Sequence, residues 1–143
     1  MNILNGYDIE DLSPGMSASV SKTVTEADII LFSGVSMDVN PVHLYESFAS
    51  TTMFKGRIAH GMLSAGFISA VLANKLPGPG TIYLAQSLKF KSPVRPGDTV
   101  TAKVTVREVM VEKKRVVLDT VCSVGDRVAI EGEATMLCTT SRS

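Results

Sequence analysis

Two short segments of the sequence concentrate side chains that can move protons. The first is SMDVNPVH, over residues 36–43. Pro41 disfavours helical geometry at Asn40, so we expect Asn40 to cap, and Pro41 to begin, a short helix that runs to about Ser50. His43 then lies in the first turn of that helix, and Asp38 lies on the loop that enters it. A carboxylate and an imidazole side by side can accept and donate a proton in turn.

The charge state of His43 depends on two opposing effects. The positive end of the helix dipole disfavours imidazolium, whereas the carboxylate of Asp38 favours it, so the sequence does not give the sign of the net pKa shift. The same eight residues are also typical of a turn followed by a helix cap, with the histidine in a structural role. Both interpretations stay open at this point.

The second segment is RIAHGML, over residues 57–63. A glycine at the start of a buried helix allows close approach to backbone N–H groups that have no partner within the helix. With the helix dipole behind them, such groups suit a developing oxyanion, which makes Gly61 a candidate donor. The alternative is that Gly61 serves only tight packing of the helix against a sheet.

The surrounding pattern predicts the elements that must position these segments. Residues 16–24 alternate as a half-buried strand, and Thr25 with Asp28 resembles a cap for a helix that ends near Val35. Residues 59–76 are apolar on nearly every side, which predicts a helix buried on all sides. The PGPG turn over residues 77–80 ends it, and four further strands follow at residues 82–90, 100–111, 116–124 and 128–138.

These elements predict an α+β fold in which a curled antiparallel sheet of about five strands wraps around one long buried helix. Neither an internal repeat nor a linker interrupts the sequence, so we expect residues 1–143 to form a single domain.

Composition argues against several functional classes. Fourteen basic and fourteen acidic residues cancel, whereas nucleic-acid binding usually requires a basic excess. Two cysteines without CxxC spacing and two histidines make no zinc signature, so no metal site is expected. The start of the chain resembles no targeting signal and no apolar run reaches membrane-spanning length, so we expect no membrane association, a cytoplasmic protein and reduced thiols.

Taken together, the motifs resemble a known family. DVNPVH at 38–43, Phe54, IAHGML at 58–63 and PGPGTIYL at 77–84 are similar to the MaoC-like, R-specific enoyl-CoA hydratases, and most of all to the short, single-hotdog members that feed polyhydroxyalkanoate synthesis. The resemblance runs from about residue 10 to residue 137. It implies a hotdog fold and a homodimer joined sheet edge to sheet edge, with active sites at the interface. It also implies reversible syn addition of water to a trans-2-enoyl-CoA thioester, giving (R)-3-hydroxyacyl-CoA, with no metal or redox cofactor.

Carried over by position, the resemblance assigns Asp38 and His43 as the catalytic pair and Asn40 as the amide that supports it. Gly61 becomes the oxyanion N–H and Ser69 a position that lines the site, while His60 is left a structural role. Met37 and the Tyr45-Glu46 pair depart from the usual pattern and bear on the rim or the acyl pocket.

Helical spacing extends the predicted pocket beyond Gly61. Ala65, Ser69 and Leu72 follow it at i+4, i+8 and i+11, so we expect the acyl tail to run along them. A leucine at the far end predicts short acyl chains, of about four to six carbons.

Lys89, Lys91 and Arg95 form a candidate basic cluster for the phosphates of coenzyme A, or else an ordinary solvated sheet rim. Lys55 and Arg57 are a second candidate. Two other functions remain open: a dehydratase acting on acyl carrier protein or a specialised acyl-CoA, and a non-catalytic protein that binds acyl thioesters. Hotdog thioester hydrolases lack the Asp-x-Asn-Pro-x-His element.

Overall fold

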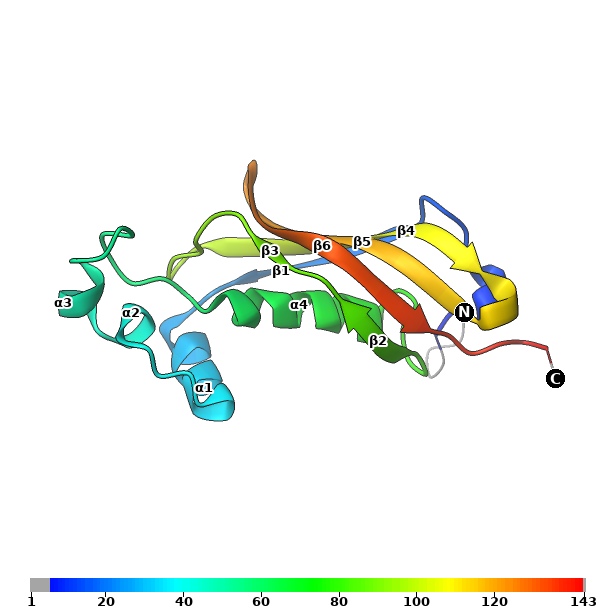
Figure 1. Cartoon of the computed structure of the whole chain (residues 1–143), viewed down its shortest axis with the longest axis horizontal. Helices are drawn as coiled ribbons and strands as arrows, with labels where there is room; N and C mark the ends of the chain where they lie inside the picture. Colours follow the sequence, from blue (N-terminus) through cyan, green and yellow to red (C-terminus); the bar gives the residue numbers. More distant parts are fainter. Residues whose placement is uncertain (1–5, 143) are drawn as a thin grey trace.

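A curved antiparallel sheet lies over one long helix in the computed structural model, which describes residues 6–142 (Figure 1). The described sheet has six strands in the order β1-β4-β5-β6-β2, and β3 also pairs with β6. The strands are β1 (Ser17–Thr23), β2 (Ile82–Gln86), β3 (Lys89–Phe90), β4 (Thr99–Met110), β5 (Arg115–Val124) and β6 (Arg127–Leu137). This is the predicted hotdog arrangement.

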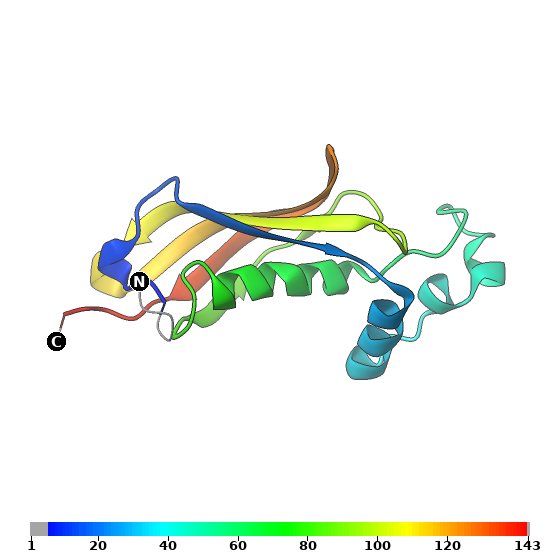
Figure 2. The same ribbon diagram turned by 180° about the vertical axis from the view of Figure 1, so that it is seen from behind.

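The long helix α4 (Gly61–Asn74) lies along one face of the sheet (Figure 2). The side that faces the sheet carries its fully buried residues, Ser64, Ile68, Val71 and Leu72. The prediction that the helix is buried on all sides is wrong for this chain, since Met62 on another side is 55% exposed. One sheet covers only one side of a helix. Helix α4 therefore has more apolar side chains than this chain alone buries.

The strand rich in valine and threonine, β4, lies inside the sheet between β1 and β5. Its alternate residues Val100, Ala102, Val104 and Val106 are buried against the core, as the period of two requires. The two ends of the strand order are therefore β1, which is polar on its outer side, and β2, where Ile82, Tyr83 and Leu84 are exposed.

The predicted strand at 82–90 is divided into β2 and β3, which accounts for six strands in place of five. Both pieces pair with β6, and the break falls at Ser87 and Leu88. Gly132 on β6 lies opposite, where a Cβ atom would overlap the carbonyl oxygen of Ser87. The glycine thus permits the close backbone approach that accompanies the break.

Three short helices extend past one end of the sheet (Figure 1): α1 (Glu26–Ser36), α2 (Pro41–Leu44) and α3 (Glu46–Ala49). Two 3₁₀ turns, η1 (Ile9–Asp11) and η2 (Val111–Lys113), complete the elements. The predicted cap is confirmed, since Thr25 and Asp28 form a reciprocal capping box on α1. The helix expected to reach Ser50 is instead interrupted at Tyr45, which adopts extended geometry. Within residues 6–142, the structure contains no helix with the length and apolar character needed to cross a membrane.

Candidate active site

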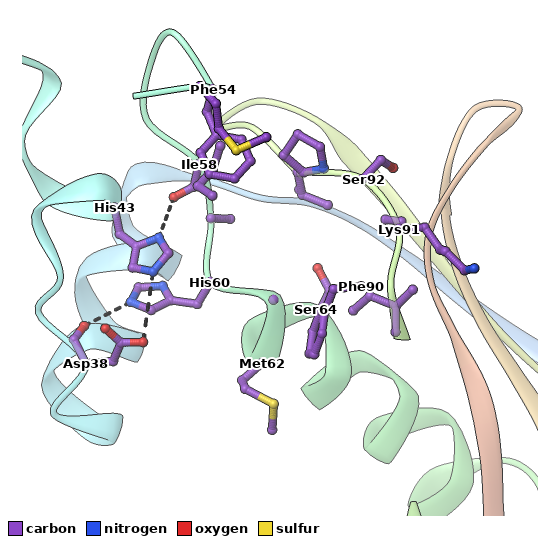
Figure 3. Close-up of a pocket in the computed structure, with 17 residues that line it drawn as sticks. Asp38, His43, Phe54, Ile58, His60, Met62, Ser64, Phe90, Lys91 and Ser92 are labelled. Carbon is purple, nitrogen blue, oxygen red and sulfur yellow. Dashed lines mark hydrogen bonds and ion pairs between the residues drawn. The ribbon is translucent and has the colours of Figure 1, made fainter. Parts of the chain in front are cut away.

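A cavity of about 550 Å³ lies at the N-terminal end of α4 (Figure 3). It is bordered by the loop that precedes α4, by β3 and the residues after it, and by the start of β6. Both predicted chemical segments reach it, through Asp38 and His43 from one and through His60 and Gly61 from the other. Folding therefore brings together segments that lie about twenty residues apart.

Side chains of the 36–40 loop hold its backbone in place. The Ser36 hydroxyl accepts a hydrogen bond from the Asp38 N–H, and Oδ1 of Asp38 accepts one from the Asn40 N–H, both at 3.2 Å. Asn40 in turn caps α2 by accepting from the Val42 N–H at 3.1 Å. The predicted cap is confirmed, and it leaves Oδ2 of Asp38 free to face His43.

His43 is only 9% exposed and is held from two sides. Its Nδ1 lies 2.8 Å from the carbonyl oxygen of Ile58. Its own carbonyl accepts from Nε of Arg57 at 2.7 Å, and the Arg57 guanidinium is anchored by two hydrogen bonds to the carboxylate of Glu26. Arg57, a candidate coenzyme A contact in the sequence, is thus engaged in holding the backbone at His43.

The hydrogen bonds determine which nitrogen of His43 is available. A carbonyl oxygen can only accept, so Nδ1 carries the proton in its bond to Ile58 and Nε2 is a free acceptor. Nε2 lies 3.9 Å from Oδ2 of Asp38, too far for a direct hydrogen bond. Two proton acceptors therefore face each other across a gap at the edge of the cavity.

Burial lowers the pKa of His43, and the neighbouring His60 acts in the same direction. The hydrogen bond to the Ile58 carbonyl and the negative charge of Asp38 act the other way without outweighing burial. The sign that the sequence left open is therefore negative, and His43 is neutral near pH 7.

His60 packs directly against His43, with stacked rings whose centroids are 3.9 Å apart. Its Nε2 lies 3.0 Å from the carbonyl oxygen of Asp38 and 3.1 Å from the Ser33 hydroxyl, so it donates to the backbone of the catalytic loop (Figure 3). The ring is 2% exposed. Hydrogen bonds fix this ring at the helix entry, which agrees with the structural role predicted for His60, and the ring also supports the face of His43.

Asp38, His43 and His60 offer potential ligand atoms within 4.8 Å of one another. The lone pairs of an imidazole lie in the plane of its ring, and these two rings are inclined by only 28°. Lone pairs of stacked rings run side by side and do not converge on one ion. The cluster is better suited to holding a proton-transfer pair than to holding a metal.

Gly61 begins α4, so its N–H has no acceptor within the helix. A Cβ atom at this position would overlap the ring of Phe90, which lines the same cavity. Close packing therefore requires the glycine, as one of the two interpretations proposed. An N–H at the cavity without an acceptor in its own helix is compatible with the other interpretation as well.

Comparisons with known proteins agree with this geometry. The model of the MaoC like domain matches residues 12–127. This chain belongs to the MaoC-like family. It is 63% identical over 128 residues to an (R)-specific enoyl-CoA hydratase from Rhodospirillum rubrum, covering 90% of this chain and 89% of that protein. It is 48% identical over 125 residues to a 3-hydroxybutyryl-CoA dehydratase from Methylorubrum extorquens. That match covers 87% of this chain and 80% of the relative. The solved structure of the R-hydratase PhaJ1 from Pseudomonas aeruginosa superposes with a TM-score of 0.89 at 41% identity. The superposition covers 96% of this chain and 89% of that structure.

A second cavity, of about 490 Å³, lies on the other flank of α4 in this MaoC-like domain, between that helix and β2. Ala65 and Ser69 line it. Gly61 lines the first cavity and not this one, so the prediction that Gly61, Ala65 and Ser69 share one pocket is wrong. Leu72 does not share their environment: it is fully buried in the core. Leu72 lies about 60° around the helix from Ser69, toward the sheet, so the prediction that it closes the acyl pocket is corrected.

The predicted basic cluster is also divided by the fold. Lys91 lines the first cavity, with Nζ 3.3 Å from Glu131, whereas Lys89 lines a third cavity beside Arg107. The guanidinium of Arg95 donates to the carbonyl of Phe54 and thereby stabilises the loop before α4. The three residues therefore do not form one phosphate site.

Several residues of the first cavity had no functional prediction, and Ser64, Phe90 and Met62 are among them. Phe90 belongs to a strand of alternating polarity. The one signal that pointed to it was Gly61, because a glycine at a helix start indicates a close neighbour. Ser64 lies within the apolar helix, where it is one of two hydroxyls among mostly aliphatic side chains, and this was a usable signal.

Proposed function

We propose that this MaoC-like domain is an (R)-specific enoyl-CoA hydratase, which adds water reversibly and on one face to a trans-2-enoyl-CoA. The observation that carries the proposal is the pair of acceptor atoms, Oδ2 of Asp38 and Nε2 of His43, 3.9 Å apart at the same cavity as the Gly61 N–H. Sequence similarity to hydratases of that name supports it independently.

The two acceptors suit a water molecule as their common partner. Water can donate one hydrogen to Asp38 and the other to His43, which leaves an oxygen lone pair directed at C3 of the substrate. As the C–O bond forms, one proton passes to the pair, and the pair returns a proton to C2 on the same face. Donor and acceptor roles belong to the coupled pair.

Charge develops on the thioester oxygen as C3 is attacked, because the intermediate resembles an enolate. The Gly61 N–H, at the positive end of α4, is the proposed donor to that oxygen. No electron is transferred and no Lewis acid is needed in this sequence, so we propose that neither a metal nor a redox cofactor takes part. Full activity after prolonged treatment with EDTA is the expected result.

The direct test is loss of the ultraviolet absorbance of crotonyl-CoA on addition of the protein, with chiral analysis of the product. Formation of (R)-3-hydroxybutyryl-CoA is expected, and the reverse reaction should regenerate the absorbance. A panel of acyl-CoA and acyl carrier protein substrates separates the hydratase from a carrier-protein dehydratase. Absence of turnover with every substrate would favour the non-catalytic alternative.

We further propose a homodimer joined through β2. This strand lies at the end of the sheet and exposes apolar side chains, Ile82 at 56% and Leu84 at 43%, whereas the outer face of β1 is rich in serine. A second copy would cover both this edge and the exposed side of α4. Light scattering should give a dimer mass, Leu84→Lys should weaken the dimer, and Ser17→Lys on β1 should not.

Lys91 is the remaining candidate for the phosphates of coenzyme A, because it alone of the three predicted residues borders the first cavity. Lys91→Ala should raise KM for crotonyl-CoA several-fold and leave KM for the N-acetylcysteamine thioester unchanged, since that substrate lacks phosphate. Lys89→Ala, two residues earlier on β3 and outside the first cavity, serves as the control.

We also propose that residues 1–143 form one domain and that the protein acts in the cytoplasm. Cys122 and Cys138 are buried free thiols, and burial raises the pKa of Cys122 to about 12 and that of Cys138 to about 11. Such thiols suit a reducing compartment. Cell fractionation followed by detection of the protein tests the location.

A further inference from the structure

Ser64 has a side chain that the fold does not use. It lies on the sheet side of α4, it is fully buried, and it lines the first cavity (Figure 3). Within the part of the chain that the structure describes, its Oγ has no hydrogen-bond partner. Its backbone oxygen is already engaged, since it accepts from Sγ of Cys122 at 3.4 Å.

An unpaired buried hydroxyl lowers stability unless something pairs with it. Serine within a helix usually donates to the carbonyl four residues before it, but Ser64 does not bond to His60. Its neighbours in the cavity wall include Ala59, Val94, Ala129 and Ile130, which offer no side-chain partner. Alanine would therefore suit the fold of this site better than serine.

The position of Ser64 on the helix relates it to the proposed oxyanion donor. It follows Gly61 by three residues, so it lies about 4.5 Å further along the axis and about 60° around it. Both residues border one cavity. A substrate carbonyl bound at the end of α4 would therefore lie close to both residues.

We propose that the Ser64 hydroxyl donates a hydrogen bond to a carbonyl oxygen of the bound acyl thioester. This inference rests on the proposed function and adds a substrate-binding residue to it. The acceptor is the thioester oxygen or the nearest amide oxygen of the pantetheine arm, which have the same chemistry. Ser64 is not a nucleophile here, since no base lies in hydrogen-bond contact with its Oγ.

The test compares activity with stability in Ser64→Ala. Loss of the hydrogen bond should lower kcat/KM for crotonyl-CoA roughly ten- to hundredfold, while removal of an unpaired hydroxyl should raise Tm by roughly 2–4 °C. Ser69→Ala, on the same helix but half-buried, is the control for the general effect of alanine on Tm. A serine that only stabilises the fold would show the opposite pattern, with a lower Tm and unchanged turnover of folded protein.

Two substrates identify the acceptor. Crotonyl-CoA contains both carbonyls, and the crotonyl thioester of a simple alkanethiol contains only the thioester oxygen. Loss with both substrates identifies the thioester, and it should appear mainly in kcat because the bond strengthens as the enolate forms. Loss with crotonyl-CoA alone, mainly in KM, identifies the amide. Equal kcat/KM for Ser64→Ala and the parent protein with both substrates would overturn the inference while leaving the hydratase function intact, whereas an inactive parent protein would refute the function itself.

Discussion

The two cavities that flank the first turns of α4 are built differently. The first holds Asp38, His43 and His60, and their positions are set by hydrogen bonds from the same chain. The second contains no charged residue and lies beside the exposed strand β2. The difference indicates that residues of one chain fix the positions of Asp38 and His43, whereas the apolar side is left, in our proposal, for the substrate tail and a second copy.

The strongest test of this division removes the reacting groups of the first cavity. Asp38→Asn and His43→Ala should each lower kcat/KM by roughly 10²–10⁴. Asp38 is exposed, so near-normal thermal unfolding is expected for Asp38→Asn. His43→Ala loses the ring stacked on His60 and the bond to Ile58, so it should unfold at a lower temperature, and its activity is measured where it is folded. Asp126→Asn, at an exposed turn, is the matched control and should retain activity. Near-normal hydration rates in both active-site variants would refute the catalytic assignment.

Leu72 tests where the second cavity ends. Because its side chain is fully buried in the core, Leu72→Ala should reduce the free energy of unfolding by about 2–5 kcal/mol. The preference among enoyl-CoA substrates from butenoyl to decenoyl should stay unchanged. Urea denaturation and kcat/KM across the series measure the two effects, and improved turnover of long substrates would restore Leu72 to the pocket wall.

His60 tests whether the support of the first cavity can be separated from its chemistry. His60→Gln should reduce the free energy of unfolding by about 1–3 kcal/mol, because the variant loses the stacked ring and the bond to the Asp38 carbonyl. The folded variant should keep kcat/KM within about tenfold of the parent. A stable variant without turnover would instead make His60 part of the chemistry.

The pH dependence follows from the lowered pKa of His43. Since neutral His43 is the active form, kcat/KM should stay constant down to the ordinary value of 6.5, then fall by roughly tenfold per unit below the lowered pKa. Stability should change in the same direction: the unfolded chain takes up the proton first as pH falls through 6.5, so the folded state loses stability there. In His43→Ala the stability loss in this pH range should be smaller than in the parent protein. Equal profiles of stability against pH in the two proteins would mean that His43 is not the cause of the loss.

The smallest expected effect concerns the tail. Ala65→Val narrows the second cavity and should disfavour longer enoyl chains by about fourfold for each methylene excluded, from about 0.8 kcal/mol per buried CH₂. Ala73→Val, on an exposed side of the same helix, is the control. The measurement is kcat/KM from butenoyl- to decenoyl-CoA. A uniform change in both variants would mean that the tail takes another path.

Some features depend only on neighbours in the chain, and the sequence determined them. The capping box of Thr25 and Asp28, the cap at Asn40 and the strand alternation of residues 100–106 all formed as predicted. Asp38 and His43 belong to the same group, since only four residues separate them and one of these, Pro41, limits how the loop can turn.

Other features depend on which surfaces meet, and only the tertiary structure decided them. The stack of His60 on His43, the separation of Leu72 from Ser69 and the unpaired hydroxyl of Ser64 arise where distant segments pack. The sign of the His43 pKa shift belongs here too, because burial decides it and burial is set by the surrounding fold. Periodicity gives the direction in which a side chain leaves its own helix, but the sheet, loop or ring placed opposite determines its environment.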